Sequence, residues 1–216
     1  MVLLDWLKAR WLRVLVHAAA LAPLVWTIWQ YWQGLFLVDP VREITTRTGR
    51  TALILLVLSL ACTPLGTVLG LKRVLRVRRA LGMYAFLYAS LHFATFVGLD
   101  YGFDVGLLGQ AVFDQPYVLV GLAAGLILLA LALTSTQGWQ RRLGKNWKRL
   151  HRLVYVAVLL AVVHMTWILK DPGDPLRYLV VLALLFVLRL PPVRRGVSRV
   201  RYWFKTKISA AQHASS

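Results

Sequence analysis

Long apolar runs separated by short charged stretches dominate the sequence. Six of them approach or exceed the roughly 20 residues that an α-helix needs to cross a bilayer core of about 30 Å. They cover residues 14–32, 51–71, 80–99, 116–134, 153–169 and 176–190. No stretch between them is long enough to fold by itself. We therefore predict an all-α membrane protein, a single domain over residues 1–216 with six transmembrane helices.

Composition and charge support this fold and give it an orientation. Hydrophobic residues make up 59% of the chain and charged residues 16%, whereas about a quarter of an average globular chain is charged. With the N-terminus in the cytoplasm, 21 of the 26 Lys and Arg residues fall on the cytoplasmic side. Loops rich in Lys and Arg stay inside, so both termini are predicted to be cytoplasmic. Seven of the eight acidic residues then lie outside.

Two other interpretations of the charged ends are disfavoured. The basic tail 194–207 contains aromatic residues, as nucleic-acid-binding segments do, but anionic lipid headgroups already account for its charge; no nucleic-acid partner is predicted. The first apolar run resembles a cleaved signal peptide, but Trp26 and Trp29 stand where a small-residue cleavage site belongs. The only cysteine, Cys62, has no intrachain disulfide partner.

Three of the five histidines lie within the apolar runs, where ionisable residues are costly and often functional. His92 stands 12 residues into the third run, and His164 stands 13 residues after His151, at the start of the fifth. These spacings correspond to roughly 18 and 20 Å along an α-helix. Both runs point outward, so the two imidazoles are predicted at one depth in the outer half of the bilayer. His17 lies in the first run, and His213 lies in the polar tail.

Two neutral imidazoles on facing helices suit the two axial positions of haem iron, and helical bundles commonly hold such a group. Zinc takes three or four protein ligands, and no carboxylate or thiol lies at that depth. We therefore predict a b-type cytochrome bundle in which His92 and His164 bind haem iron. A hydrogen bond to a neighbouring helix is the alternative for each single histidine, and it is the preferred one for His17.

His151 is harder to assign. Its spacing from His164 places the two side chains roughly 140° apart on an ideal helix, so they share a face only if the helix tilts or begins after His151. At the matching depth the third run carries Arg78 and Arg79 rather than histidine. A second, inner haem or a flavin site at His151 stays open.

Three segments carry a resemblance to a known family: GRTALILLVLSLACTPL (49–65), RRALGMYAFLYASLHFATF (78–96) and LALTSTQGWQRRLGKNWKRLHRLVYVAVLLAVVHMTW (131–167). They resemble the haem-binding membrane subunits of the bacterial periplasmic methionine sulfoxide reductase system. That family belongs to the ferric-reductase-like transmembrane group, which includes NADPH oxidases. The larger group typically has two histidines on the third span, and here Arg78 and Arg79 take the place of the inner one.

The resemblance implies a function, cofactors and partners. It implies haem at the positions of His92, His151 and His164, with one haem b or two, and FMN as a further cofactor. Electrons would cross the bacterial inner membrane from the quinol pool or a cytosolic flavin reductase. Their acceptor would be a periplasmic molybdopterin-containing methionine sulfoxide reductase that repairs oxidised proteins. The chain has no G-x-G-x-x-G motif, so catalytic sulfoxide reduction and hydride uptake are assigned to partner proteins.

Other residues have both a functional and a structural interpretation. Tryptophans near the span ends could serve an electron path or anchor the helices at the membrane interface. Arginines could hold haem propionates or an FMN phosphate, or they could set the topology. Glycines could let a porphyrin approach the backbone or allow close helix packing, and aspartates of the outer loop could dock a basic partner. These residues are Trp139, Trp147, Trp167; Arg78, Arg79, Arg149, Arg152; Gly82, Gly98, Gly121, Gly125; and Asp100, Asp104, Asp114.

Two rival functions remain. A stand-alone transmembrane ferric or quinone reductase would use the same haem chemistry without a partner enzyme. A small-solute or proton-coupled transporter would use the histidines as ligands, but such folds usually show internal repeats and broken spans. We find no internal repeat in the sequence.

Overall fold

The computed structural model describes residues 2–168, 173–193 and 195–197, and this part of the chain is helical throughout, with no strand. The all-α prediction is confirmed. The elements are α1 (Val2–Trp32), α2 (Pro40–Thr67), the 3-10 helix η1 (Lys72–Arg76), α3 (Arg78–Thr95), the π-helix η2 (Phe96–Asp100), α4 (Val105–Asp114), α5 (Pro116–Leu133), α6 (Gln137–Leu143), α7 (Lys145–Leu150), the 3-10 turn η3 (His151–Leu153), α8 (Val154–Ile168) and α9 (Gly173–Val187).

Five stretches of the described chain are long and apolar enough to cross a membrane: Trp11–Trp32, Pro40–Thr67, Arg78–Asp100, Pro116–Leu133 and Lys145–Ile168. A sixth is counted if α9 and the segment Pro191–Val197, bent by 68°, form one span. The prediction of a multi-pass helical membrane protein is thereby confirmed. The end of the fifth predicted span at residue 169, most of the basic tail and His213 lie outside the described residues.

Helical structure also forms outside the predicted apolar runs. α2 begins at Pro40, 11 residues before the predicted span, because Asp39 caps it through a hydrogen bond from the Arg42 amide at 2.9 Å. A Glu43–Arg47 ion pair of 2.6 Å supports this polar first part. In the acidic outer loop, Asp104 accepts from the Leu107 amide at 3.0 Å and starts α4. N-terminal caps therefore start helices at positions that the long apolar runs did not predict.

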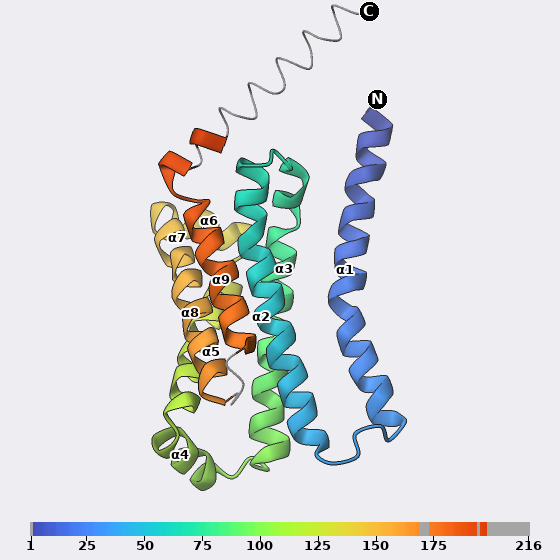
Figure 1. Ribbon diagram of the computed structural model, residues 1–216, viewed down its shortest axis with the longest axis vertical. Coiled ribbons are helices and arrows are strands. Elements are labelled where there is room, and N and C mark those ends of the chain that lie inside the picture. The colour runs from blue at the N-terminus through green and yellow to red at the C-terminus, as the bar shows by residue number, and fades with distance from the viewer. Residues whose placement is uncertain (1, 169–172, 194, 198–216) are drawn as a thin grey trace, which may run out of the picture.

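Basic and acidic connections lie at opposite ends of the bundle. The N-terminus, η1, α6 and α7 lie at the upper end in Figure 1, whereas the α1–α2 connection and α4 lie at the lower end. The first group carries runs of Lys and Arg, and α4 and its flanks carry Asp100, Asp104 and Asp114. The charge asymmetry seen along the sequence is therefore an asymmetry between the two ends of the fold.

α2 is the central helix, because its apolar residues meet other helices on several sides. It contacts α1, α3, α8 and α9, and Leu53, Leu56 and Leu60 are all buried. Pro64 lacks an amide hydrogen, which leaves the Leu60 carbonyl without its usual helical donor. The Arg189 guanidinium donates to this carbonyl and so ties the end of α9 to the middle of α2.

Tyr88 is one of the residues that join α3 to α1. Tyr88 is buried, and its hydroxyl accepts from the Leu24 amide at 3.0 Å and donates to the Ala20 carbonyl at 2.7 Å. Those two backbone groups would otherwise bond to each other within α1, so the hydroxyl is inserted into the hydrogen-bond ladder beside Pro23. Backbone groups in lipid must be satisfied inside the protein, and Tyr88 achieves this while joining two helices.

Candidate functional site

The structure brings His92 of α3 and His164 of α8 together within the bundle. Their ring centroids lie 6.0 Å apart, and their planes are nearly perpendicular at 89°. Both side chains are half-buried. Two residues 72 positions apart in the sequence are thus neighbours, because α3 and α8 run through the bilayer in the same direction and place them at one depth.

Backbone carbonyls fix the protonation pattern of both rings. The Nδ1 of His92 lies 2.8 Å from the Thr45 carbonyl oxygen, and the Nδ1 of His164 lies 2.7 Å from the Tyr117 carbonyl oxygen. A carbonyl only accepts, so each Nδ1 carries the proton and donates it. The Nε2 atoms are then unprotonated, with no hydrogen-bond partner among the described residues. Metal-ligating histidines are commonly oriented by such a bond from the other nitrogen.

A glycine lies against each imidazole. A Cβ atom at Gly49 would stand 2.9 Å from Nδ1 of His92, and a Cβ atom at Gly121 would stand 2.7 Å from Nδ1 and Cε1 of His164. Either distance is shorter than real Cβ contacts allow, so any larger residue would displace the ring. The backbone of α2 and the backbone of α5 each form a close-fitting wall for one histidine.

The two halves of the site are built alike. Each carbonyl belongs to a residue 47 positions before its histidine, and each glycine lies one helical turn after the carbonyl residue. The helix pairs α2–α3 and α5–α8 therefore repeat one local construction. This likeness lies in the contacts around the two histidines.

The geometry fits a metal held between two imidazoles. Two metal–nitrogen bonds of about 2 Å, with about 1 Å from each nitrogen to its ring centre, separate the centroids by roughly 6 Å. A T-shaped contact between the two rings also fits this distance. It would leave two unpaired nitrogens inside an apolar bundle, which is costly. Within the described residues no group of three or more potential ligands gathers, so the donor set matches the two axial positions of haem better than zinc.

His151 lies apart from this pair, in the 3-10 turn η3 that precedes α8. α8 begins at Val154, so this α-helix starts after His151, which is one of the two arrangements that the sequence left open for His151 and His164. The Nε2 of His151 lies 3.2 Å from the Thr134 hydroxyl, which already donates to the Ala130 carbonyl at 2.7 Å. Nε2 is therefore the donor to Thr134. The ring stacks on Trp147 at 4.0 Å between centroids.

The two arginines at the start of α3 have different surroundings. Arg78 is half-buried, and its carbonyl accepts from the Ser59 hydroxyl at 2.9 Å. Arg79 is exposed and lines a cavity between α1 and α3. His17 also lines that cavity, and its Nδ1 lies 2.8 Å from the Tyr84 hydroxyl. This is the interhelical hydrogen bond preferred for His17 from the sequence.

The remaining candidates are spread over the molecule. Trp139 and Trp167 are exposed, as are Arg149 and Arg152, and so are all three aspartates of the outer loop. A Cβ atom at Gly82 would meet Ser59, one at Gly98 would meet Phe103, and one at Gly125 would meet nothing within 4 Å.

Sequence reasoning missed most of the surroundings of the histidine pair. Gly49 lies in a polar stretch that was taken as a connection, and Gly121 was considered for porphyrin approach rather than contact with His164. The carbonyls of Thr45 and Tyr117 leave no side-chain signal, because every residue has a carbonyl. The glycine spacing of 72 residues, equal to that of the histidines, was the one available clue.

Comparisons with known proteins identify one family. Residues 48–162 match the family model described as ferric reductase like transmembrane component. Three relatives, each called protein-methionine-sulfoxide reductase heme-binding subunit MsrQ, come from Xanthomonas. Those of Xanthomonas euvesicatoria pv. vesicatoria (strain 85-10) and Xanthomonas axonopodis pv. citri (strain 306) are both 49% identical, and that of Xanthomonas oryzae pv. oryzae (strain MAFF 311018) is 47% identical. Each match covers 80% of this chain and 83% of the relative.

Proposed function

The chain belongs to the MsrQ family of ferric-reductase-like membrane proteins, and from that premise we propose that it is the haem-binding, electron-transferring subunit of a protein-methionine-sulfoxide reductase. The family resemblance inferred from the sequence is confirmed. The relatives carry haem binding in their name, and this chain offers a pair of histidines for it. Catalytic sulfoxide reduction takes place on a partner protein.

The pairing of His92 with His164 is the observation that supports this proposal most. Their ring centroids are 6.0 Å apart, and both unprotonated Nε2 atoms are available as axial ligands. When bound, haem b supplies an iron that takes up and releases one electron at a time. The carbonyls of Thr45 and Tyr117 hold the proton on Nδ1 and keep each ring in its ligating orientation.

Within the described residues no thiol or carboxylate joins the pair to make a group of three potential ligands. Reduction of one methionine sulfoxide consumes two electrons and two protons and releases methionine and water. The subunit therefore delivers two electrons per sulfoxide, one after the other, and the protons are taken up where the sulfoxide is reduced. The chemistry on the substrate needs a docked acceptor.

The direction of transfer follows from the charge asymmetry. With the basic end in the cytoplasm of a bacterial inner membrane, the pair lies in the outer half of the bilayer, on the side of α4. Electrons then arrive from quinol or a cytosolic flavin reductase and leave to a periplasmic, molybdopterin-containing methionine sulfoxide reductase that repairs oxidised proteins. Both termini are cytoplasmic in this arrangement.

His151 belongs to electron uptake at the basic end. It lies about 20 Å from His164 along the chain direction of α8, and Trp147 covers one face of its ring. We propose a second haem or an FMN at this position, as the family resemblance implies. Arg149 and Arg152, which are exposed on either side of His151, are suitable partners for propionates or a flavin phosphate.

The α4 region is the proposed docking surface for the periplasmic enzyme. Asp100, Asp104 and Asp114 are exposed there, and the segment 100–115 contains no Lys or Arg. Phe103 and Phe113 are 72% and 82% exposed. Small redox interfaces combine an apolar contact with complementary charge that speeds encounter, and this surface offers both.

The test is spectroscopic. The dithionite-reduced minus oxidised spectrum of purified protein, with haem and flavin quantified per chain, should show low-spin b-type haem. The reduced protein should be oxidised by the purified periplasmic enzyme together with methionine sulfoxide. Oxidation by ferric chelates or quinones alone would instead indicate a stand-alone reductase. Absence of haem from well-folded protein would contradict the proposal and favour a transporter.

A further inference from the structure

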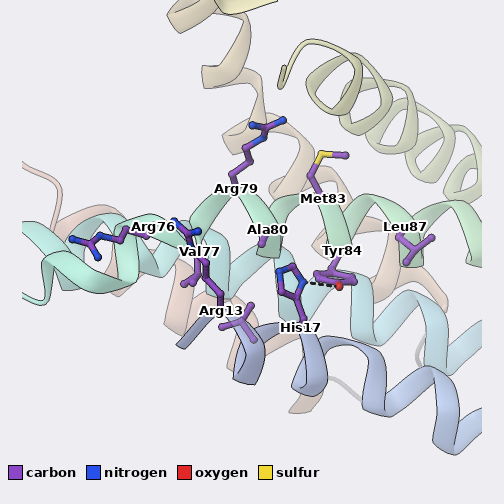
Figure 2. Close-up of a pocket in the computed structure, with 10 residues that line it drawn as sticks. Arg13, His17, Arg76, Val77, Arg79, Ala80, Met83, Tyr84 and Leu87 are labelled. Atoms are coloured by element: carbon purple, nitrogen blue, oxygen red, sulfur yellow. Dashed lines mark hydrogen bonds between the residues drawn. The ribbon is translucent and has the colours of Figure 1, made fainter. Parts of the chain in front are cut away.

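A cavity of about 470 Å³ lies between α1 and α3 at the basic end of the bundle. Figure 2 shows Arg13 on α1 and Arg76 and Arg79 on the α3 side among the residues that line it. All three arginines are exposed. The volume falls within the roughly 300–1,000 Å³ typical of small-molecule sites, and the histidine pair is not part of it.

The charge of this cavity is uncompensated. None of the ten lining residues is acidic, and within the described chain none of the three arginines forms an ion pair. Arg13 belongs to α1 and the other two arginines lie on the α3 side, so an anion bound in the cavity would be attracted from both sides.

The walls below the arginines are aliphatic. Val16, Met83 and Leu87 line the cavity toward the bilayer centre. The polar groups there are His17 and Tyr84, which are hydrogen-bonded to each other at 2.8 Å (Figure 2). The cavity therefore combines a cationic rim at headgroup level with an apolar interior. This arrangement suits acyl chains and offers few partners to the polar edge of a flavin ring.

We propose that this cavity binds the phosphate headgroup of an anionic phospholipid, with its acyl chains against α1 and α3. Basic pockets between transmembrane helices on the cytoplasmic side recognise such headgroups, and guanidinium groups match phosphate geometry. The lipid joins α1 to the bundle at the end where Arg13 of α1 and Arg76 and Arg79 on the α3 side line the cavity. The Tyr88 bridge joins the same two helices farther along α1.

The experiment uses the full chain in nanodiscs of phosphatidylcholine alone, of phosphatidylcholine with phosphatidylglycerol, and of phosphatidylcholine with added FMN. Wild type is compared with the cavity variant Arg13→Gln, Arg76→Gln, Arg79→Gln. The control variant Arg141→Gln, Lys145→Gln, Lys148→Gln removes three exposed charges at the same end. Native mass spectrometry measures retained lipid, and thermal unfolding measures the stabilisation.

Phosphatidylglycerol should be retained by the wild type and raise its unfolding midpoint, the cavity variant should lose both effects, and the control variant should keep both. Arg13→Gln alone should show a partial loss and replaces the triple variant if that one does not accumulate. Equal retention in the cavity variant overturns the proposal, and so does equal loss in the control, since bulk surface charge then explains the binding. A shift produced by FMN and not by phosphatidylglycerol assigns the phosphate to a flavin and also overturns it.

Discussion

Gly121 lies so close to His164 that a Cβ atom at position 121 would stand 2.7 Å from Nδ1 of the imidazole. The same Nδ1 donates to the Tyr117 carbonyl one turn earlier on α5, so the ring is held between a hydrogen bond and a wall without a side chain. The position of the His164 ring, and hence the direction of its free Nε2, therefore depends on Gly121, which has no side chain to bind a ligand.

Gly121→Ala should therefore impair haem binding without breaking the fold. The added methyl group pushes the His164 ring away from the Tyr117 carbonyl, and changes in groups that orient a metal ligand typically cost about 10–100-fold in metal affinity. Haem per chain and the low-spin spectrum, measured on purified protein, check this outcome.

Gly125→Ala is the matched control, one turn along the same helix, because a Cβ atom there meets nothing within 4 Å. It should keep full haem and gain up to about 1 kcal/mol of helix stability. Gly49→Ala should resemble Gly121→Ala, because Gly49 contacts His92 in the same way. Full haem in both Gly49→Ala and Gly121→Ala would contradict the role of the glycine walls.

His92→Ala and His164→Ala should each abolish the low-spin haem of the paired site, with similar spectra. Removing either imidazole leaves the iron with one axial ligand from the protein, so the two losses are equivalent. His17→Ala is the control and should keep the spectrum, because His17 bonds to Tyr84 and not to the pair. A full low-spin spectrum in either variant of the pair would show that His92 and His164 are not its axial ligands.

His151→Ala separates electron uptake from the outer site. The residue lies in η3 against Trp147 and Thr134, about 20 Å from His164, so the outer haem should keep its spectrum. Reduction by the cytoplasmic donor should slow, whereas reduction by dithionite should not. Both rates are measured by following haem absorbance after mixing. If stable His151→Ala protein loses all haem, the chain does not have two distinct sites.

Tyr88→Phe should loosen α1 while leaving the apolar packing in place. The change removes both hydrogen bonds that hold α1 to the Tyr88 hydroxyl, and one such bond contributes about 0.5–1.5 kcal/mol to stability. Thermal unfolding in nanodiscs should show a lowered midpoint. Tyr84→Phe is the control with a smaller expected effect, because its partner His17 is exposed. Equal unfolding midpoints for Tyr88→Phe and wild type would show that the Tyr88 hydrogen bonds do not stabilise the protein.

The helices were predictable because lipid imposes one strong rule, that about 20 apolar residues are needed to cross the bilayer. The predicted runs starting at residues 14 and 116 agree with Trp11–Trp32 and Pro116–Leu133 to within three residues at each end. The early start of α2 was not predicted, because Asp39 and the Glu43–Arg47 pair stabilise a helix without an apolar pattern. α4 was missed because it is apolar but too short to cross a bilayer, and Asp104 caps a segment that was taken as a loop.

The common depth of His92 and His164 was foreseeable from the sequence, since equal spacing on parallel helices gives equal height. Their distance and orientation were not, because they depend on backbone carbonyls and on the absence of a side chain at Gly49 and Gly121. The Tyr88 bridge was equally hidden. Nothing in the sequence indicates that its hydroxyl enters the ladder of another helix.

The acidic surface at α4 leads to a prediction about docking. Replacing Asp100, Asp104 and Asp114 together by Asn should slow oxidation of the reduced haem by the periplasmic enzyme. Asn is chosen as the replacement because Asp104 caps α4 and Asn caps a helix equally well. Loss of complementary charge should reduce the association rate about tenfold or more at low ionic strength. The deficit should shrink as salt screens the wild type, since the screening length falls to about 10 Å at 0.1 M.

Stopped-flow mixing of pre-reduced subunit with the purified enzyme across an ionic-strength series measures both effects. Asp39→Asn with Glu43→Gln is the control, since it removes charge at the same end but on the α1–α2 side, and it should oxidise at the wild-type rate. Identical rates for wild type and the triple variant at low salt would exclude α4 as the docking surface. Failure of the enzyme to oxidise even the wild type would instead exclude the proposed partner.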